Sequence, residues 1–177
     1  MKYLKISEIF NISIYRHLQK CLYKGVCPKL STNRSFTGEL WHLIRKGICQ
    51  NIASNCVLTP VHIGLYRMCE FKIDNGCFIG MKCYLDDLCV DIIIIGNNVT
   101  ISYGVYFACH GRKQEHNMIV IKDGAYIGMR TSITARHDIE IGEGAIIGAM
   151  ALVNKSVPAG TTAVGVPCRV INSQNKI

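Results

Sequence analysis

Aliphatic residues recur every six positions along much of this chain, from Ile73 to Val153. An amphipathic helix would repeat about every 3.6 residues and a half-buried strand every two, so the pattern fits neither. Gly, Asn or Asp often stands between the aliphatic residues, at positions where a chain turns. The residues that open the hexads fall into groups of three separated by short insertions: Ile73, Ile79, Leu85, Ile95, Ile101, Phe107, Ile121, Ile127, Ile133, Ile141, Ile147 and Val153.

Hexads in groups of three predict a triangular parallel β-solenoid, in which each hexad supplies one short flat strand and one corner. The leading aliphatic side chain points into the prism, a small residue packs inward near the corner, and Gly or Asn takes the corner conformation. Stacked coils would bury the aliphatic ladder continuously, which explains how a chain with only 8% aromatic residues can be stable.

Two helical segments are expected before the solenoid. Residues 1–25 carry apolar residues near helical spacing, and residues 37–52 predict a second short helix with Thr37 as its N-cap. Residues 53–72 are expected to form an irregular first coil. The expected organisation is a helical segment over residues 1–56, a β-helix domain over 57–171 and a flexible tail over 172–177.

Composition narrows the class of protein. The 177 residues suffice for one domain with a sizeable core, and the formal net charge is +8. Many basic residues lie in the first part of the chain without the interleaved aromatic residues of a nucleic-acid surface. We therefore expect no nucleic-acid partner; a solvated positive surface and a phosphate-bearing ligand both remain open.

The cysteines and the apolar segments indicate the cellular compartment of the protein. Ten cysteines are scattered singly, so we expect them to fill core positions in a reducing cytoplasm. No apolar run has the length of a membrane span or the form of a signal peptide, which predicts a cytoplasmic, soluble protein. The alternative is that the basic N-terminal helices contact a membrane surface.

The repeat is interrupted between Phe107 and Ile121. The chain spends fourteen residues there, where two hexads would take twelve, and the stretch HGRKQEHN lacks the inward aliphatic residues of a wall strand. It is therefore expected to leave the solenoid as a loop. Loops held on a rigid scaffold are common places for catalytic groups, and this one carries His110 and His116.

The hexads, together with the closing segment VPAGTTAVGVPCRVI at residues 157–171, resemble the hexapeptide-repeat acyltransferases, in particular the sugar O-acetyltransferases. The resemblance covers roughly residues 57–171. It implies a left-handed parallel β-helix, acetyl-CoA as co-substrate, no metal, and a homotrimer with its sites between subunits. The implied activity is transfer of an acetyl group to a hydroxyl or amine of a carbohydrate or nucleotide-sugar acceptor.

The resemblance implies that His110 is the general base, which removes a proton from the acceptor as the acceptor attacks the thioester. His116 is the competitor, because its place before the next hexad resembles a histidine of serine acetyltransferases. Both histidines could also be plain polar loop residues. The remaining histidines lie outside the matching positions and are expected at the surface or at corners: His17, His42, His62 and His137.

Acceptor contacts are implied at Asp86 and Asp87, since carboxylates accept hydrogen bonds from sugar hydroxyls. The alternative for this pair is a turn at a solenoid corner. Lys82 stands where some relatives carry an asparagine at the acceptor site.

Coenzyme A contacts are implied at four further residues. Met129 and Ala149 match positions that lie along the pantetheine arm, in the groove between subunits. Lys155 and Arg169 match basic residues that meet the phosphates, for which ammonium and guanidinium groups are suited. The alternative for these two basic residues is a solvated rim.

Three other functions remain open. The first is serine O-acetyltransferase. Asp87 argues against this assignment, because it stands one coil before the loop, where those enzymes also have a histidine. γ-type carbonic anhydrases share the solenoid, but no suitable third histidine ligand precedes His110 and His116. A non-catalytic hexapeptide scaffold would bind no coenzyme A.

Overall fold

The computed structural model describes residues 36–86, 91–109 and 116–171. The chain divides into two compact units, residues 1–44 and 45–177, and the second contains the whole solenoid. Of the first unit, the structure describes only the start of helix α2 (Phe36–Gly47). The helix expected over residues 1–25 and the tail expected over 172–177 lie outside the described residues.

Short helical elements open the second unit. After α2 the chain forms a π-helical turn, η1 (Ile48–Ile52), and a 3-10 turn, η2 (Ala53–Asn55). The segment over 53–72 then contains a regular helix, α3 (Thr59–Met68), so the expectation of an irregular coil there is wrong. A proline in the first turn presets a helical φ, and the buried residues of α3 recur at helical spacing: His62, Ile63 and Tyr66.

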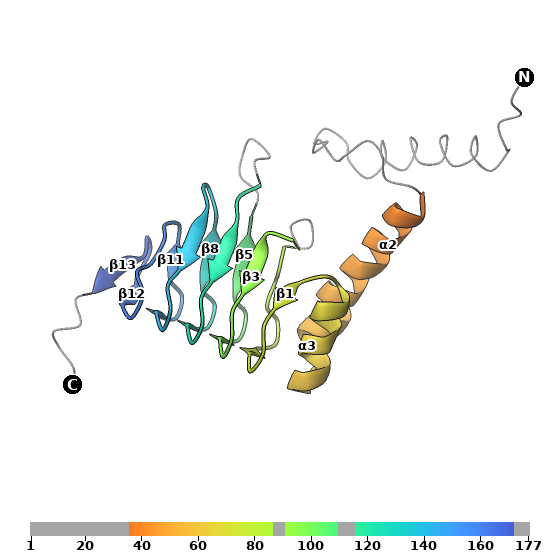
Figure 1. Cartoon of the computed structure of the whole chain (residues 1–177), viewed down its shortest axis with the longest axis horizontal. Helices are drawn as coiled ribbons and strands as arrows, with labels where there is room; N and C mark the ends of the chain where they lie inside the picture. The colour runs from red at the N-terminus through yellow and green to blue at the C-terminus, as the bar shows by residue number, and fades with distance from the viewer. Residues whose placement is uncertain (1–35, 87–90, 110–115, 172–177) are drawn as a thin grey trace, which may run out of the picture. The chain divides into compact units, whose positions relative to one another are not determined.

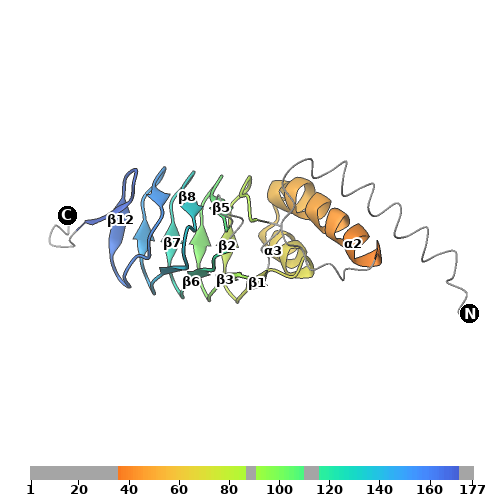
Figure 2. The ribbon, with the colours of Figure 1, turned by 90° about the horizontal axis from the view of Figure 1, so that it is seen from above.

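The solenoid has three faces, each a sheet of short strands that stack from coil to coil (Figures 1 and 2). Face A contains β1 (Lys72–Ile73), β3 (Ile93–Ile95), β6 (Ile119–Ile121) and β9 (Ile139–Ile141). Face B contains β2 (Phe78–Ile79), β4 (Thr100–Ile101), β7 (Tyr126–Ile127), β10 (Ile146–Ile147), β12 (Thr162–Val164) and β13 (Arg169–Ile171). Face C contains β5 (Tyr106–Ala108), β8 (Ser132–Thr134) and β11 (Leu152–Val153).

Among the described strands, pairing is parallel between successive coils and antiparallel only where β13 folds back on β12. Helix α3 lies against β1 and β2, so it covers the end of the first coil (Figure 2). The solenoid axis thus begins at a helix and ends at the antiparallel hairpin of β12 and β13.

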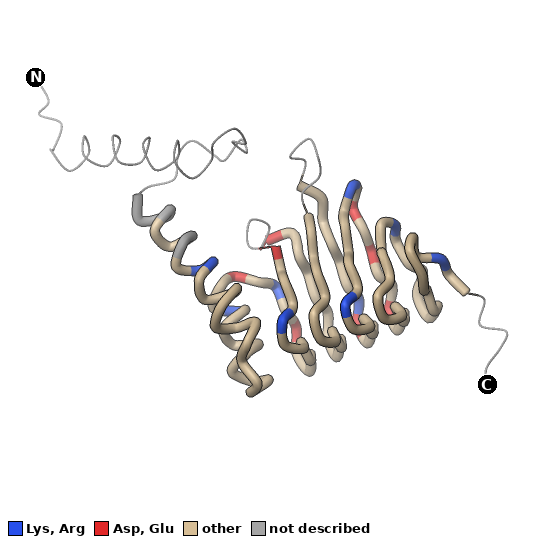
Figure 3. The backbone as a smooth tube through the Cα atoms, turned by 180° about the vertical axis from the view of Figure 1, so that it is seen from behind, with Lys and Arg blue, Asp and Glu red and all other residues tan. Residues whose placement is uncertain are grey.

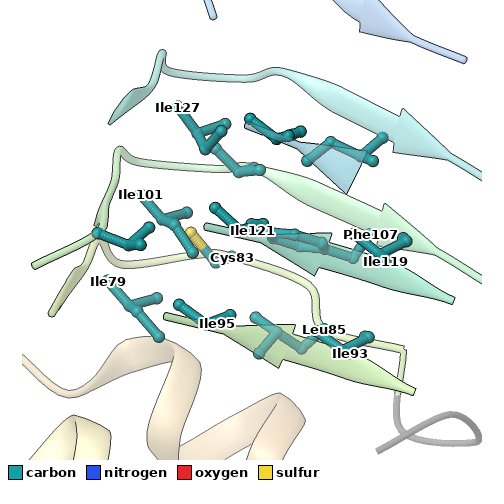
Figure 4. Packing of buried hydrophobic residues seen from close by; sticks show 14 of the residues in the cluster. Ile79, Cys83, Leu85, Ile93, Ile95, Ile101, Phe107, Ile119, Ile121 and Ile127 are labelled. Carbon is teal, nitrogen blue, oxygen red and sulfur yellow. The ribbon is translucent and has the colours of Figure 1, made fainter. Parts of the chain in front are cut away.

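The aliphatic ladder fills the centre of the prism (Figure 4). On face B, Ile79 pairs with Ile101, Ile101 with Ile127, and Ile127 with Ile147, each in direct register. All the residues predicted to open hexads are buried, none more than 6% exposed. The predicted solenoid core is therefore confirmed, residue by residue.

Corners carry backbone conformations with positive φ. Gly takes several of them, and Asn98 has a φ of 54°, as the hexad pattern predicts. Lys82, Arg130 and Met150 also have φ values between 54° and 60°, although longer side chains rarely adopt this region. The stack of coils therefore imposes the corner geometry even where the local sequence does not favour it.

Cysteines act as small core residues. Cys77 and Cys83 point inward near corners, and burial raises the pKa of the Cys83 thiol to about 11. Their thiols therefore stay protonated near neutral pH. The other fully buried cysteines among the described residues are Cys49, Cys69 and Cys109.

Charged residues of the solenoid lie mainly at turns, and the two signs are interspersed (Figure 3). Lys122 and Glu140, for example, form an exposed ion pair with 3.7 Å between Nζ and Oε2. Within the described ranges, no helix is long and apolar enough to span a bilayer.

Candidate functional site

Where the repeat is interrupted, the chain leaves the solenoid after β5 and returns to it before β6. Strand β5 ends at Ala108 and β6 begins at Ile119, as the sequence predicts. The backbone N–H of Asn117 donates to the carbonyl of Cys109 at 2.9 Å, and the Asn117 side-chain amide donates to the carbonyl of Ala135 at 3.0 Å. These bonds close the base of the loop and hold it to the next coil.

Both candidate histidines adjoin this closed base. His110 follows Cys109 directly but lies outside the described residues. His116 precedes Asn117, and its side chain is exposed. The Cys109–Asn117 bond therefore brings Cys109 and Asn117, the two described ends of the loop, together at one edge of face C. Sequence reasoning missed Asn117, because nothing in its local pattern signals a contact with the other end of the loop.

Asp86 lies beneath the loop base, where it is 0% exposed. Its Oδ2 accepts a hydrogen bond from the backbone N–H of Cys109 at 3.1 Å. A buried carboxylate needs such partners, because removal from water is costly. This geometry joins the Asp86 carboxylate to the backbone that carries His110. Asp87, its expected companion, lies outside the described residues.

Lys82 stands at the corner between β2 and face C and contacts the preceding helical turns. Its ammonium group donates to the side-chain oxygen of Asn55, and its backbone N–H donates to the carbonyl of Ser54 at 2.6 Å. The structure therefore does not bring Lys82 together with Asp86 and the loop base, which lie at the other end of face C.

A stack of turns, here called the corner row, joins faces B and C; it consists of Met81, Tyr103, Met129 and Ala149. Backbone hydrogen bonds tie its levels together: Gly104 donates to Met81 at 3.0 Å, Arg130 to Tyr103 at 2.9 Å, and Met150 to Met129 at 2.8 Å. The two residues predicted to line the pantetheine arm, Met129 and Ala149, thus lie on neighbouring levels. The first two levels were not foreseen.

Close packing at this corner explains the glycine that follows many hexad isoleucines. A Cβ on Gly128 would lie 2.5 Å from the backbone nitrogen of Ala149, far inside contact distance. Only glycine lets adjacent turns approach this closely. The side chain of Met129, the next residue, is 48% exposed.

Both predicted phosphate contacts lie in the last coil. Lys155 is exposed at the bend after β11, and Arg169 is exposed on β13. The segment between β12 and β13 contains a cis Val166–Pro167 bond and is held to β11, since Cys168 donates to the carbonyl of Leu152 at 2.8 Å. The two cations therefore occur on adjoining segments at the C-terminal end of the solenoid.

The loop base and the corner row lie at opposite ends of face C. Each strand of this face leaves the corner row and runs toward the loop edge; from Gly104 to Cys109 the extended chain spans about 16 Å. In acyl transfer, the acceptor atom must lie within hydrogen-bond reach of the base and close to the thioester carbonyl. Within one chain, the loop base and the corner row are therefore separated by the length of face C.

The described histidines outside the loop differ from one another. His137 is exposed at a bend after β8, as expected for a corner residue. His62 is 1% exposed, so the expectation that it lies at the surface or a corner is wrong. It is on the buried side of α3, and burial lowers its pKa from the ordinary value. No group of three or more His, Cys, Asp or Glu residues suited to a metal occurs in the described part of the chain.

Sequence comparison finds partial matches to acetyltransferases, and no family model matches. The chain is 34% identical to the serine acetyltransferase of Bacillus subtilis (strain 168), over 66% of this chain and 49% of that protein. It is 34% identical to the galactoside O-acetyltransferase of Escherichia coli (strain K12), over 59% of this chain and 58% of that protein. The chain thus spans roughly half the length of these two curated relatives.

Structure comparison decides the fold. A hexapeptide-repeat acetyltransferase from Vibrio cholerae matches with a TM-score of 0.59 at 21% identity, over 78% of this chain and 93% of that one. The chain has the fold of this hexapeptide-repeat acetyltransferase. A galactoside acetyltransferase in complex with coenzyme A matches with a TM-score of 0.57 at 21% identity, over 77% and 82% of the two chains. The expected fold class, a left-handed parallel β-helix after a short helical segment, is thereby confirmed for this hexapeptide-repeat chain.

Proposed function

We propose that this hexapeptide-repeat protein is an acetyl-CoA-dependent acetyltransferase that acts on a hydroxyl or amine of a carbohydrate acceptor. The carbohydrate class is supported by the similarity to galactoside O-acetyltransferase and by the closing motif at 157–171. The observation that carries the proposal is the closed loop base, because the Asp86–Cys109 and Cys109–Asn117 hydrogen bonds fix the backbone beside both histidines.

In the proposed reaction, the neutral imidazole of His110 accepts the proton of the acceptor hydroxyl while the oxygen attacks the thioester carbonyl. A C–O bond forms and the C–S bond breaks. The imidazolium then returns the proton to the coenzyme A thiolate. No covalent acyl-enzyme is needed, and His116 is proposed as a contact for the acceptor.

The acceptor and coenzyme A are proposed to contact different residues. Asp87 and Lys82 remain proposed acceptor contacts at the first coil, whereas Asp86 is proposed to hold the loop that carries His110. The pantetheine arm is proposed to run along Met129 and Ala149, with its phosphates near Lys155 and Arg169.

We further propose a homotrimer in which each site is formed by two chains. The proposal is supported by the separation of the loop base and the corner row, which are about 16 Å apart along face C of one chain, because a neighbouring chain could bring the two together. A closed three-fold ring would form three equal sites of this kind.

Serine O-acetyltransferase is the second candidate, because serine acetyltransferases are among the similar curated proteins. Asp87 in place of the second histidine argues against it. A non-catalytic scaffold is the third reading.

The test is an assay of thiol release from acetyl-CoA across free sugars, nucleotide sugars and serine. We expect a sugar-dependent signal in the native protein, a loss of at least about 100-fold in His110→Ala, and a smaller loss in His116→Ala. His137→Ala is the matched control, since this exposed histidine lies at a bend outside the loop. Preference for serine, or full activity without His110, would contradict the proposal, and no binding of coenzyme A would support a scaffold.

A further inference from the structure

A second column of residues runs beside the corner row. It is here called the outer column, and it consists of the residues that directly follow the row members: Lys82, Gly104, Arg130 and Met150. All four have a left-handed backbone, with φ between 54° and 71°. Because the turns are stacked and share this conformation, the side chains of the column leave the solenoid side by side. The three side chains that it carries are exposed.

Gly104 leaves a gap in the outer column between two cations. A Cβ on Gly104 would have one described atom within 4 Å, the Cγ of Arg130 at 3.4 Å. The stem of Arg130 therefore lies at the edge of the gap, and no other described group comes as close. Successive levels are about 4.8 Å apart, so the Cα atoms of Lys82 and Arg130 stand about 10 Å apart on either side of Gly104.

The charge of this gap is positive. Within the described ranges, neither Lys82 nor Arg130 forms an ion pair, and neither the corner row nor the outer column contains Asp or Glu. The ammonium group of Lys82 donates to the neutral side-chain amide of Asn55 and keeps further N–H donors. The guanidinium of Arg130 presents a planar set of donors that matches a carboxylate or a phosphate. An exposed gap between two such cations suits an anionic group.

The gap lies at the level of the loop base. Gly104 precedes β5 in the coil that ends at Cys109, so both belong to one level of the solenoid. In a three-fold ring whose axis runs along the solenoid, each level of a neighbouring chain stays at the same height. The neighbour's loop base would then meet the corner row near Gly104. The phosphates of coenzyme A, in contrast, are proposed to lie at the last coil.

We propose that Arg130 and Lys82 bind an anionic group of the carbohydrate acceptor, a carboxylate or a phosphate, in the gap over Gly104. The inference rests on the proposed acetyltransferase function and narrows its acceptor to acidic carbohydrates. Arg130 binds the anion through paired N–H donors, and Lys82 adds a second positive charge. Tyr103, which precedes the gap and is 43% exposed, offers an aromatic surface to the sugar ring.

The test compares galactose, galacturonate and galactose 1-phosphate as acceptors, because the three share one ring and differ in charge. We expect kcat/KM for at least one anionic sugar to exceed that for galactose by about tenfold or more. The preferred sugar shows whether the group is a carboxylate or a phosphate. Added salt should raise the KM for the anionic acceptor and leave the KM for galactose unchanged, because salt screens exposed charges.

Variants of Arg130 test its part in this preference. Arg130→Met removes the charge with a side chain that fits the corner, since Met150 has the equivalent position one level on, with a φ of 57°. We expect the KM for the preferred anionic sugar to rise about tenfold or more, with little change in kcat and none for galactose. Arg130→Lys keeps the charge without the planar donors and should lose less.

Lys122→Met is the matched control, because it removes one positive charge from an exposed ion pair at the corner between faces A and B. Thermal melting shows that each variant is folded. Equal use of galactose and the anionic sugars, or equal effects of the two Met variants, would overturn this inference and leave the acetyltransferase intact.

The affinity for acetyl-CoA, measured by calorimetry without acceptor, separates the two possible sources of the anion. We expect it to be unchanged in Arg130→Met. A weaker affinity for acetyl-CoA with an unchanged KM for the acceptor would place a coenzyme A phosphate in the gap and overturn the acceptor assignment. A native protein that transfers acetyl groups to none of the three sugars would contradict both this inference and the proposed function.

Discussion

Asp86 shows how a single buried side chain can connect the core to the candidate site. Its carboxylate is 0% exposed, at the end of the first turn around the prism, and accepts from the N–H of Cys109. Cys109 is itself fully buried and bonds through its carbonyl to Asn117. The residue next along the chain is His110. The backbone that precedes the proposed base is therefore held by a carboxylate that is distant in sequence.

Substitution of Asp86 should affect catalysis more than donor binding. Asp86→Ala leaves the Cys109 N–H buried without this partner, at a cost of about 1–3 kcal/mol, and loosens the loop. We expect kcat to fall at least tenfold, which corresponds to a rise in the activation free energy of about 1.4 kcal/mol or more. The KM for acetyl-CoA should stay unchanged, because the corner row lies at the other end of face C. Asp86→Asn, which keeps an acceptor oxygen, should recover much of kcat. Steady-state kinetics with thermal melting measures both effects.

Asp123 provides the control for this experiment. Its Oδ1 also accepts from a backbone N–H, that of Asn97 at 2.9 Å, but at the corner between faces A and B. Asp123→Ala should lower stability without a selective loss of kcat. If Asp86→Ala and Asp123→Ala reduce kcat equally, Asp86 has no special link to the loop.

The elements of the solenoid are stable only as a stack. Strands of two or three residues make too few contacts to persist alone. In the stack, each inward isoleucine packs between those of the coils before and after it, as Figure 4 shows for Ile79, Ile101 and Ile127. Every coil therefore contributes to the stability of its neighbours, as in other repeat proteins.

Truncation of one central isoleucine of the core should lower the stability of the protein. Ile127 is 0% exposed and lies between Ile101 and Ile147. Ile127→Ala should lower the free energy of unfolding by about 2–5 kcal/mol, because it leaves a cavity in a close-packed core. Val120→Ala, at a partly exposed position of β6, should cost much less. Urea unfolding followed by circular dichroism measures both; similar losses would mean that the ladder is not the main source of stability.

At the scale of the whole molecule, the separation of loop base and corner row makes assembly part of the proposed function. In the proposed function, one chain of 19.7 kDa would present half of a site at each end of face C. The sites would be completed only where two chains meet, so activity should depend on the trimer. Dilution below the dissociation concentration should then abolish activity without unfolding the chain.

Mixed trimers test whether two chains share a site. His110→Ala lacks the proposed base, and Ala149→Trp, at an exposed turn, blocks the proposed pantetheine row. Each variant alone should be inactive. Refolded together in equal amounts, they should regain about one quarter of native activity, because each mixed trimer contains one intact pair of half-sites. Light scattering confirms assembly, and no recovery in properly mixed trimers would mean that each chain carries a complete site.

The sequence by itself determined the solenoid, since a six-residue pattern of inward residues is local, repeats in every coil and has one way to be buried. Ile73 to Val153 therefore follow the prediction, as do the corner glycines and the place where the repeat breaks. Only the tertiary structure decided the positions that depend on distant segments: Asp86 under the loop base, Lys82 against Asn55, and His62 on the buried side of α3. These contacts join residues of different coils or of a coil and a helix, and no periodic pattern encodes them. The roles of His110, His116 and the coenzyme A residues remain predictions, because they concern chemistry between chains and ligands.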